Sequence, residues 1–270
     1  MSDWEPELYN RFRRFRAEPF EHILGRLAGR LALAPDSAVA DLGCGPGDNA
    51  AELARRVASG RVHGIDLSPA MIEAAGKLRA GLPADLQARL SFALGDIAEL
   101  ASTPSYPVIF SNAALQWIPN HRAVLSRWLG ALDAGGTMVV QMPANESETA
   151  KRELDRIVGE PRWSELLGKS TRPFDQVPPP EHYRRLMDEI GFIEVDCYHR
   201  TFHHPMNSPA EVVQWYRSTA LRPILAALPA GRREDFMSAY RERLEGAYGT
   251  SGPMTFDFKR LFVWGRRSAS

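Results

Sequence analysis

The chain has 270 residues, of which 44% are hydrophobic, and its 33 basic residues balance 33 acidic ones. This composition is typical of a globular protein large enough for one domain with an insertion. The net charge of zero argues against broad binding of nucleic acid, which needs clustered positive charge, and no apolar run approaches the ~20 residues that span a membrane.

Short β-branched runs alternate with helical stretches in the first half of the chain. We expect strands at 38–43, 61–66, 90–96, 107–112 and 137–143, and helices at 48–59, 68–82 and 120–132. Ser68 is the expected N-cap of the second helix and Pro69 its first turn, while Gly135 and Gly136 are expected to close the third helix. Such alternation predicts parallel βαβ units in a doubly wound, Rossmann-like sheet.

The pattern changes after residue 143. The chain is polar and helical from about 145 to 190 with a break at 177–183, and further helices are expected at 208–228 and 232–248. Strands are expected at 192–205 and 256–267, which would complete a seven-stranded sheet of the α/β class. The predicted organisation begins with an N-terminal lid or helical segment at 1–30 and an α/β core at 31–143. Two helical cap insertions are expected at 144–190 and 206–252, and the last two core strands at 191–205 and 253–267.

The first strand leads into a glycine-rich loop, VADLGCGPGD, with Gly43, Gly45 and Gly47 at every second position. Ligands of open α/β sheets bind at the carboxyl ends of the strands, and a loop without side chains lets its backbone approach the ligand. Dinucleotide enzymes use G-x-G-x-x-G to hold a pyrophosphate. Here the spacing is G-x-G-x-G behind Asp41, whose carboxylate would repel a pyrophosphate and attract an ammonium or sulfonium group. The loop therefore favours S-adenosylmethionine and methyl transfer over a dinucleotide oxidoreductase.

Two further acids end the second and third strands. Asp66 lies about 20 residues past the loop, where an acid accepts hydrogen bonds from ribose hydroxyls. Asp96 is placed to face the adenine amino group. The other expected cofactor contacts come from the same strand ends: Cys44, as a small spacer, with Leu67, Met71, Ile97, Asn112, Ala113 and Trp117.

Segments from end to end resemble the trans-aconitate 2-methyltransferase family. They include SDWEPELYNRF at the N-terminus, SNAALQWIPNH at 111–121, VVQMPAN at 139–145, VVQWYRSTALRP at 212–223 and KRLFVWGRR at 259–267. The resemblance implies a class I methyltransferase fold with a helical cap, and methyl transfer to a carboxylate of a small polycarboxylic acid. Because the chain departs from the family pattern at Glu18, Ala144 and Lys151, the expected acceptor is trans-aconitate or a related acid.

Methylation of a carboxylate sets few chemical demands. A carboxyl group with a pKa near ~4 is ionised at neutral pH, so no general base and no metal is needed, and catalysis comes from orientation and a dry pocket. We expect Arg222 and Arg260 to hold the non-reacting carboxylates of the acid, because a guanidinium pairs with a carboxylate through two hydrogen bonds. Tyr9, Tyr183 and Trp215 are expected to complete the substrate site, and the expected positioning residues are Gln116, Trp117, Gln141 and His203.

Alternatives stay open for the acceptor. A hydroxyl acceptor would need a base, for which His203 is the candidate, and a carrier-bound carboxyl group is a further option. The chain could also bind the cofactor without turnover. Two lone cysteines and an N-terminus without the apolar core of a secretory signal indicate the cytoplasm, and a monomer or weak dimer is expected.

Overall fold

The chain folds into two compact units. The computed structural model describes residues 12–27, 38–57, 60–103, 105–167, 177–217, 220–250 and 252–269. We call Pro19–Pro143, Val177–Arg200 and Leu261–Ser270 the sheet unit, and Met1–Glu18, Ala144–Gln176 and Thr201–Arg260 the helical unit. Among the described residues, none of the helices has the length and apolarity that a membrane crossing requires.

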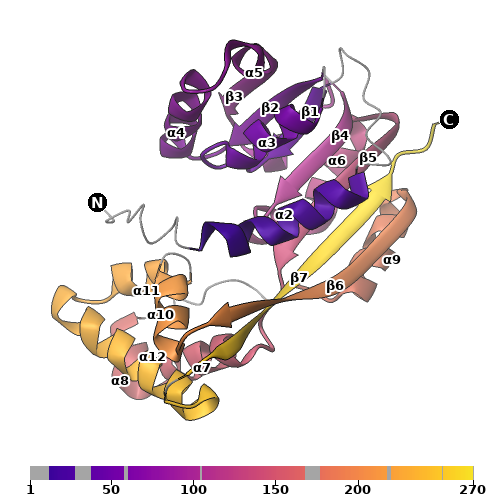
Figure 1. Cartoon of the computed structure of the whole chain (residues 1–270). Helices are drawn as coiled ribbons and strands as arrows, with labels where there is room; N and C mark the ends of the chain where they lie inside the picture. The colour runs from indigo at the N-terminus through magenta and orange to yellow at the C-terminus, as the bar shows by residue number, and fades with distance from the viewer. Residues whose placement is uncertain are drawn as a thin grey trace. The chain divides into compact units, whose positions relative to one another are not determined.

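Seven strands form one sheet in the order β3-β2-β1-β4-β5-β7-β6 (Figure 1). The strands are β1 (Ala38–Leu42), β2 (Arg61–Asp66), β3 (Leu90–Leu94), β4 (Tyr106–Asn112), β5 (Leu132–Pro143), β6 (Ile193–Met206) and β7 (Met254–Arg266). The first five pair in parallel. Strand β7 runs antiparallel to β5, because Arg267 N donates to Gly136 O near one end and Ala144 N donates to Lys259 O at the other. The predicted seven-stranded Rossmann-like sheet is confirmed.

The glycine pair at 135–136 has a different role from the predicted one. Helix α6 (His121–Ala131) ends at Ala131 and strand β5 begins at once with Leu132, so the glycines lie inside the strand rather than closing the helix. Gly135 has φ +74°, and a Cβ at Gly136 would lie 3.1 Å from Tyr106 O. The pairing of β4 with β5 shifts register at this point. The glycines therefore form an irregular stretch that the neighbouring strand approaches closely.

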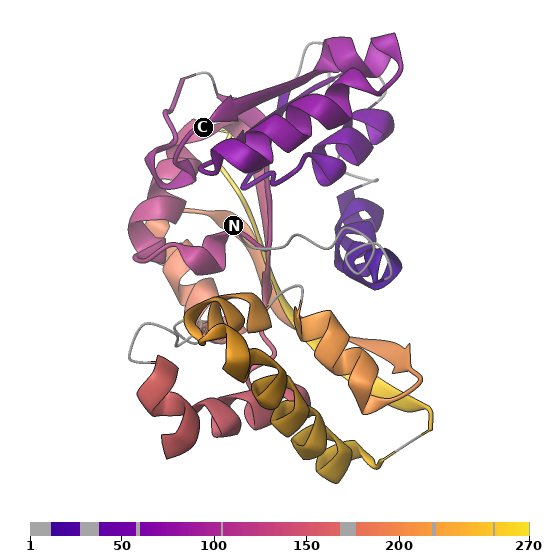
Figure 2. The same cartoon turned by 90° about the vertical axis from the view of Figure 1, so that its left-hand side faces the viewer.

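Helices flank the sheet within the sheet unit. They are α3 (Asp48–Arg56), α4 (Pro69–Ala80), α5 (Ala84–Arg89), α6 and α9 (Pro180–Ile190), with 3-10 helices at Ile97–Glu99 and Leu115–Trp117. The predicted cap of α4 is confirmed, since Ser68 Oγ accepts from Met71 N at 3.4 Å. Helix α2 (Arg13–Leu27) lies on one side of the sheet, with α6 and α9 on the other (Figure 2). The α2 side is packed through Phe20, whose ring lies 5.4 Å from that of Phe110.

The helical unit has an aromatic core. Its helices are α7 (Thr149–Val158), α8 (Pro161–Leu167), α10 (Pro209–Arg217), α11 (Leu221–Ala227) and α12 (Arg233–Tyr248), with a 3-10 turn at Ala230–Arg232. The helix predicted at 208–228 is thus two helices, because Pro223 is tolerated only in the first turn of a helix. The largest core side chains are at most 1% exposed: Trp163, Trp215, Phe236, Tyr240 and Phe256.

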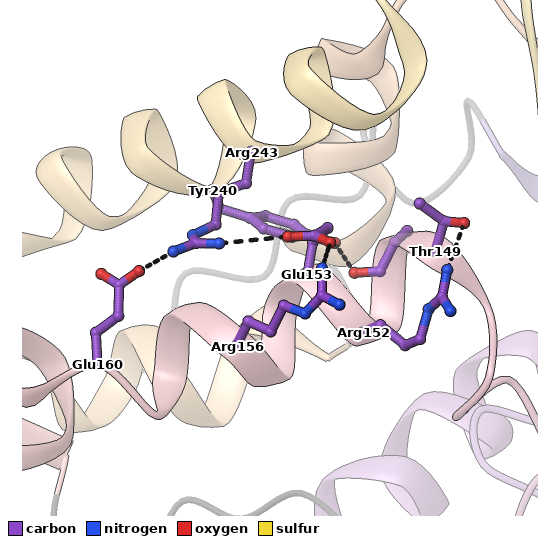
Figure 3. A network of polar contacts seen from close by, with 8 residues as sticks. Thr149, Arg152, Glu153, Arg156, Glu160, Tyr240 and Arg243 are labelled. Atoms are coloured by element: carbon purple, nitrogen blue, oxygen red, sulfur yellow. Dashed lines mark hydrogen bonds and ion pairs between the residues drawn. The ribbon is translucent and has the colours of Figure 1, made fainter.

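A polar network joins α7 to α12 (Figure 3). Glu153 is 8% exposed and accepts a hydrogen bond from Arg156 at 2.5 Å, while Arg243 Nη1 lies 3.4 Å from its other carboxylate oxygen. Arg243 also pairs with Glu160. A buried carboxylate needs such partners because desolvation penalises its charge. We therefore interpret the network as a structural link between α7 and α12 and not as a group of catalytic residues.

The two units differ from the predicted segments. The cap segment expected at 144–190 is too long, since residues 177–200 belong to the sheet unit. Helix α9 packs there because Tyr183 OH lies 2.7 Å from His121 Nδ1, and a Cβ at Gly265 would lie 2.6 Å from Met187 Cε. Conversely, residues 201–206 of β6 and 254–260 of β7 extend these strands into the helical unit.

Candidate functional site

The three glycines of the loop after β1 are bare for different reasons. All three have positive φ, at +76° for Gly43, +54° for Gly45 and +89° for Gly47. A Cβ at Gly43 would overlap the side chain of Ala114, and one at Gly47 would lie 2.8 Å from Phe92 Cζ. A Cβ at Gly45, in contrast, would meet nothing within 4 Å. At Gly43 and Gly47, neighbouring side chains of the protein occupy the space that a Cβ would need, whereas Gly45 presents bare backbone to open space.

Asp66 holds the loop in place. Its Oδ2 accepts from Gly45 N and its Oδ1 accepts from Ser68 N, both at 2.9 Å. Each carboxylate oxygen can accept a second hydrogen bond, so both oxygens retain capacity for ribose hydroxyls. Asp66, which is predicted to bind ribose, thus fixes the glycine loop against the end of β2.

Asp41 is a buried carboxylate with one oxygen that lacks a hydrogen-bond partner among the described residues. It is 1% exposed, and this oxygen is Oδ2. Burial and the nearby charge of Asp66 raise its pKa to about 7. A cationic group beside it would restore the ionised form. The ammonium group of S-adenosylmethionine fits this requirement, whereas a pyrophosphate would add negative charge to a carboxylate that already resists ionisation.

Three amide side chains near the ends of β4 and β5 also have polar atoms without hydrogen-bond partners among the described residues. These atoms are Asn112 Oδ1, Gln116 Oε1 and Gln141 Nε2, and all three are buried. The backbone that carries them is well fixed, since Ala113 N donates to Gln141 O at 2.8 Å and Gln116 Nε2 donates to Ala113 O at 2.7 Å. Ala113 itself has φ +57°. Buried polar atoms are normally satisfied, so this cluster indicates a ligand that supplies the missing partners.

Strand register places these groups on one face of the sheet. Asp41 pairs with Phe110, and Asn112 pairs with Gln141. Paired residues share a face, and so do residues two apart on one strand, so Asp41, Asn112 and Gln141 all lie on the face that carries Phe110. This is the face on which Phe20 of α2 packs. Three neighbouring strands, β1, β4 and β5, thus each contribute one unsatisfied polar group.

Apolar side chains lie at the same carboxyl edge of the sheet. Leu67 follows β2, Leu94 ends β3 and Trp117 follows β4, and they are 68%, 58% and 65% exposed. Exposed large apolar groups gathered at one edge suit a flat ring such as adenine. Leu94 was not predicted, although its place at the end of β3 could have indicated it.

The other predicted cofactor residues occupy structural positions at this edge. Asp96 is exposed and caps the following 3-10 helix, with its Oδ1 accepting from Ala98 N at 2.8 Å. Ile97 is buried, and Met71 is half-buried at the start of α4. Cys44 is buried and packs where a Cβ at Gly64 would meet its sulfur at 2.9 Å. Burial raises the pKa of the Cys44 thiol, which is consistent with a spacer rather than a nucleophile.

The helical unit holds a buried cation, Arg260. Its side chain is 6% exposed, and its guanidinium carbon lies 3.7 Å from the ring centroid of Phe258. Such burial separates it from the many solvated arginines of the chain. Trp215, 1% exposed, belongs to the same aromatic core. Arg260 thus brings one positive charge into an apolar surrounding, and its role in holding a carboxylate stays a prediction.

The two adjacent histidines on β6 face opposite ways. His203, the predicted positioning residue, is exposed and its Nδ1 lies 2.6 Å from Asp257 Oδ1. His204 is fully buried, and neither ring nitrogen has a hydrogen-bond partner among the described residues. Burial, followed by the charge of Arg260, lowers the pKa of His204 to about 4. Alternation along the strand indicated that only one histidine faces inward, but not that it is His204.

The remaining predicted substrate residues are dispersed. Arg222 is exposed on α11. Tyr183 is fully buried in the sheet unit, with its hydroxyl bonded to His121, so it does not belong to a cap. Tyr9 lies outside the described residues. Among the described residues, no group of three or more His, Cys, Asp or Glu side chains is arranged to hold a metal ion.

Comparisons with known proteins place the chain among methyltransferases. A methyltransferase domain family matches residues 39–136. The trans-aconitate 2-methyltransferase of Methylobacterium radiotolerans is 37% identical over 100% of both chains, and that of Paracidovorax citrulli is 35% identical over 100% of both. The solved structure of Haemonchus contortus phosphoethanolamine N-methyltransferase 2 in complex with S-adenosyl-L-methionine is similar in fold, with a TM-score of 0.55 at 18% identity. That likeness covers 92% of this chain and 52% of the other.

Proposed function

Because the chain belongs to the trans-aconitate 2-methyltransferase family, we propose that it methylates one carboxylate of trans-aconitate or a related small polycarboxylic acid. The methyl donor is S-adenosylmethionine. The observation that supports this donor is Asp41, a buried carboxylate whose Oδ2 has no hydrogen-bond partner among the described residues, together with the bare backbone of Gly45. The names of the full-length relatives support the acceptor.

The protein's part in this reaction is to bind and to orient. Bound S-adenosylmethionine supplies a methyl group that leaves its sulfur without the bonding electron pair. Asp41 offers a negative charge to the cationic end of the donor, and Asp66 holds both the loop and, through its free lone pairs, the ribose. The acceptor carboxylate is already ionised at neutral pH, so no side chain has to remove a proton.

The helical unit carries the features that support an anionic acceptor. Arg260 is a buried cation, and guanidinium groups suit carboxylates. The positions at which the chain departs from the family pattern also lie in this unit. Glu18 Oε2 lies 3.8 Å from His204 Nδ1, Ala144 N donates to Lys259 O, and Lys151 pairs with Asp155 on α7. The acceptor is therefore named as trans-aconitate or a related acid.

One experiment tests the reaction. The purified protein is incubated with methyl-labelled S-adenosylmethionine and a panel of di- and tricarboxylic acids, with excess S-adenosylhomocysteine as the inhibited control. We expect a labelled ester that base hydrolyses, with trans-aconitate among the acids methylated. Label on phenols or alcohols and on none of the acids would overturn the carboxylate acceptor. Thermal stabilisation by NADH but not by S-adenosylhomocysteine would overturn the cofactor.

Location and assembly complete the proposal. Cys44 and Cys197 are both free thiols in the structure, as in a reducing compartment. We propose a cytoplasmic enzyme acting as a monomer or weak dimer. Gel filtration and the redox state of the two thiols in cells test these points.

A further inference from the structure

Gln141 is a buried amide that the fold itself does not use. It is 1% exposed near the end of β5, and its Nε2 has no hydrogen-bond partner among the described residues. An unsatisfied buried polar group is costly, and an apolar side chain of the same size would pack at this position without that cost. Its backbone oxygen, in contrast, is satisfied by Ala113 N. Since no described residue supplies its partner, the amide donor is available to a ligand.

The position of Gln141 indicates what that partner is. Asp41, Asn112 and Gln141 lie on one face of three adjacent strands, in the order β1, β4, β5. Along this row, a carboxylate is followed by an amide oxygen and then by an amide N–H donor with unmet capacity. The outer two strands are about 10 Å apart, at ~4.8 Å per strand spacing. A ligand whose cationic group lies beside Asp41 on β1 would not occupy the amide donor of Gln141 on β5. That donor is then available to a second, electron-rich group.

We propose that Gln141 is the substrate-positioning residue that holds the reacting carboxylate of the acceptor acid through its Nε2 donor. This inference rests on the proposed function. Asn112, on the strand between the two outer groups, adds an amide oxygen with no hydrogen-bond partner among the described residues. Gln141 binds one oxygen of the carboxylate, and the other oxygen is left to attack.

A neutral donor suits this step better than a charged one. A carboxylate oxygen gives an electron pair to form the new C–O bond, the C–S bond breaks, and its pair stays on sulfur. A sulfonium and a carboxylate become a neutral thioether and a neutral ester, and no proton moves. Charge on the acid falls as the transition state forms, so an arginine at this oxygen would stabilise the ground state more and slow the reaction. A neutral amide orients the group at a smaller cost.

The test measures acid binding apart from turnover. S-adenosylhomocysteine and then the acid are titrated calorimetrically into wild type, Gln141→Leu and Gln141→Glu, with the acid being one that wild type methylates. Gln214→Leu, at a half-buried glutamine of α10 without an assigned role, is the matched control. Melting temperatures of the free proteins check folding.

We expect Gln141→Leu to bind the acid roughly tenfold to a hundredfold more weakly, as for the loss of a hydrogen bond to a charged group. Gln141→Glu should lose more, because it places two negative groups together. Affinity for S-adenosylhomocysteine and the melting temperature of Gln141→Leu should not fall. Unchanged acid binding by Gln141→Leu overturns the inference alone, and so does an equal loss of S-adenosylhomocysteine affinity. If wild type neither methylates nor binds any acid of the panel, the inference and the proposed function fall together.

Discussion

Replacing Asp41 by asparagine tests the electrostatic basis of the cofactor site. The substitution keeps the shape of the side chain and removes its charge. Burial and the charge of Asp66 raise the pKa of Asp41 from 3.8 to about 7 in the folded chain. At 1.36 kcal/mol per pKa unit, ionised Asp41 costs the folded protein roughly 4 kcal/mol.

The sign of this effect gives a pH dependence. The folded protein holds the Asp41 proton up to about pH 7, whereas the unfolded chain releases it near pH 3.8. The folded state binds more protons in this window, so the stability of the ligand-free protein falls as the pH rises through it. Asp41→Asn removes that loss. The variant should therefore melt higher than wild type at pH 8, by roughly 8–16 °C at 2–4 °C per kcal/mol, with a smaller difference near pH 5.

Ligand binding should change in the opposite direction. The ammonium group of S-adenosylhomocysteine stabilises ionised Asp41, so Asp41→Asn should weaken its binding roughly tenfold to a hundredfold. Wild type should also release a proton on binding near pH 6.5, measured by calorimetry in buffers of different ionisation enthalpy. The exposed Asp188→Asn on α9 is the control. If Asp41→Asn melts lower at every pH and binds S-adenosylhomocysteine as wild type does, Asp41 is a structural group and the reasoning is refuted.

Four other substitutions separate ligand effects from packing. Gly45→Ala should weaken S-adenosylhomocysteine binding strongly, and its φ of +54° should cost only about 1–2 kcal/mol of stability. Gly43→Ala should lower the melting temperature more, because its Cβ would also overlap the side chain of Ala114. Equal effects in both assays would contradict this division. Asp66→Ala should weaken binding roughly tenfold to a hundredfold and also destabilise the loop, since it removes two acceptors. Tyr240→Phe should cost about 1–2 kcal/mol in urea unfolding without affecting binding, because its hydroxyl donates to the buried Ala150 O at 2.8 Å.

Much of the cofactor site could be predicted from local patterns. Alternating strands and helices indicate parallel βαβ units, and parallel strands bring their carboxyl ends to one edge. The glycine loop and Asp66 each follow a predicted strand, so their meeting required no knowledge of packing. The predicted strands and helices agree with the structure to within a few residues, with three exceptions. Strand β5 begins earlier and contains the glycine pair, the helix expected at 208–228 is two helices, and α5 was not predicted.

The acceptor side could not be predicted in the same way. Tyr183 seemed part of a cap, but its helix packs on the sheet unit through contacts with residues far away in sequence, such as His121. Arg222 and Arg260 both stand in apolar runs, yet only Arg260 is buried. Such differences arise from which elements cover a side chain, and periodicity within one element does not contain that information.

The sequence by itself determined the kind of ligand, because a glycine spacing and strand-terminal acids act through the backbone that directly follows them. Tertiary structure alone decided which polar groups are left unsatisfied. Asp41, Asn112 and Gln141 share a face only through the register of β1, β4 and β5. Likewise, His204 rather than His203 is buried because Phe15 and Trp215 stack on its ring. Alternation along a strand tells which residues point the same way, but the residues that pack against each face decide which of them lose contact with water.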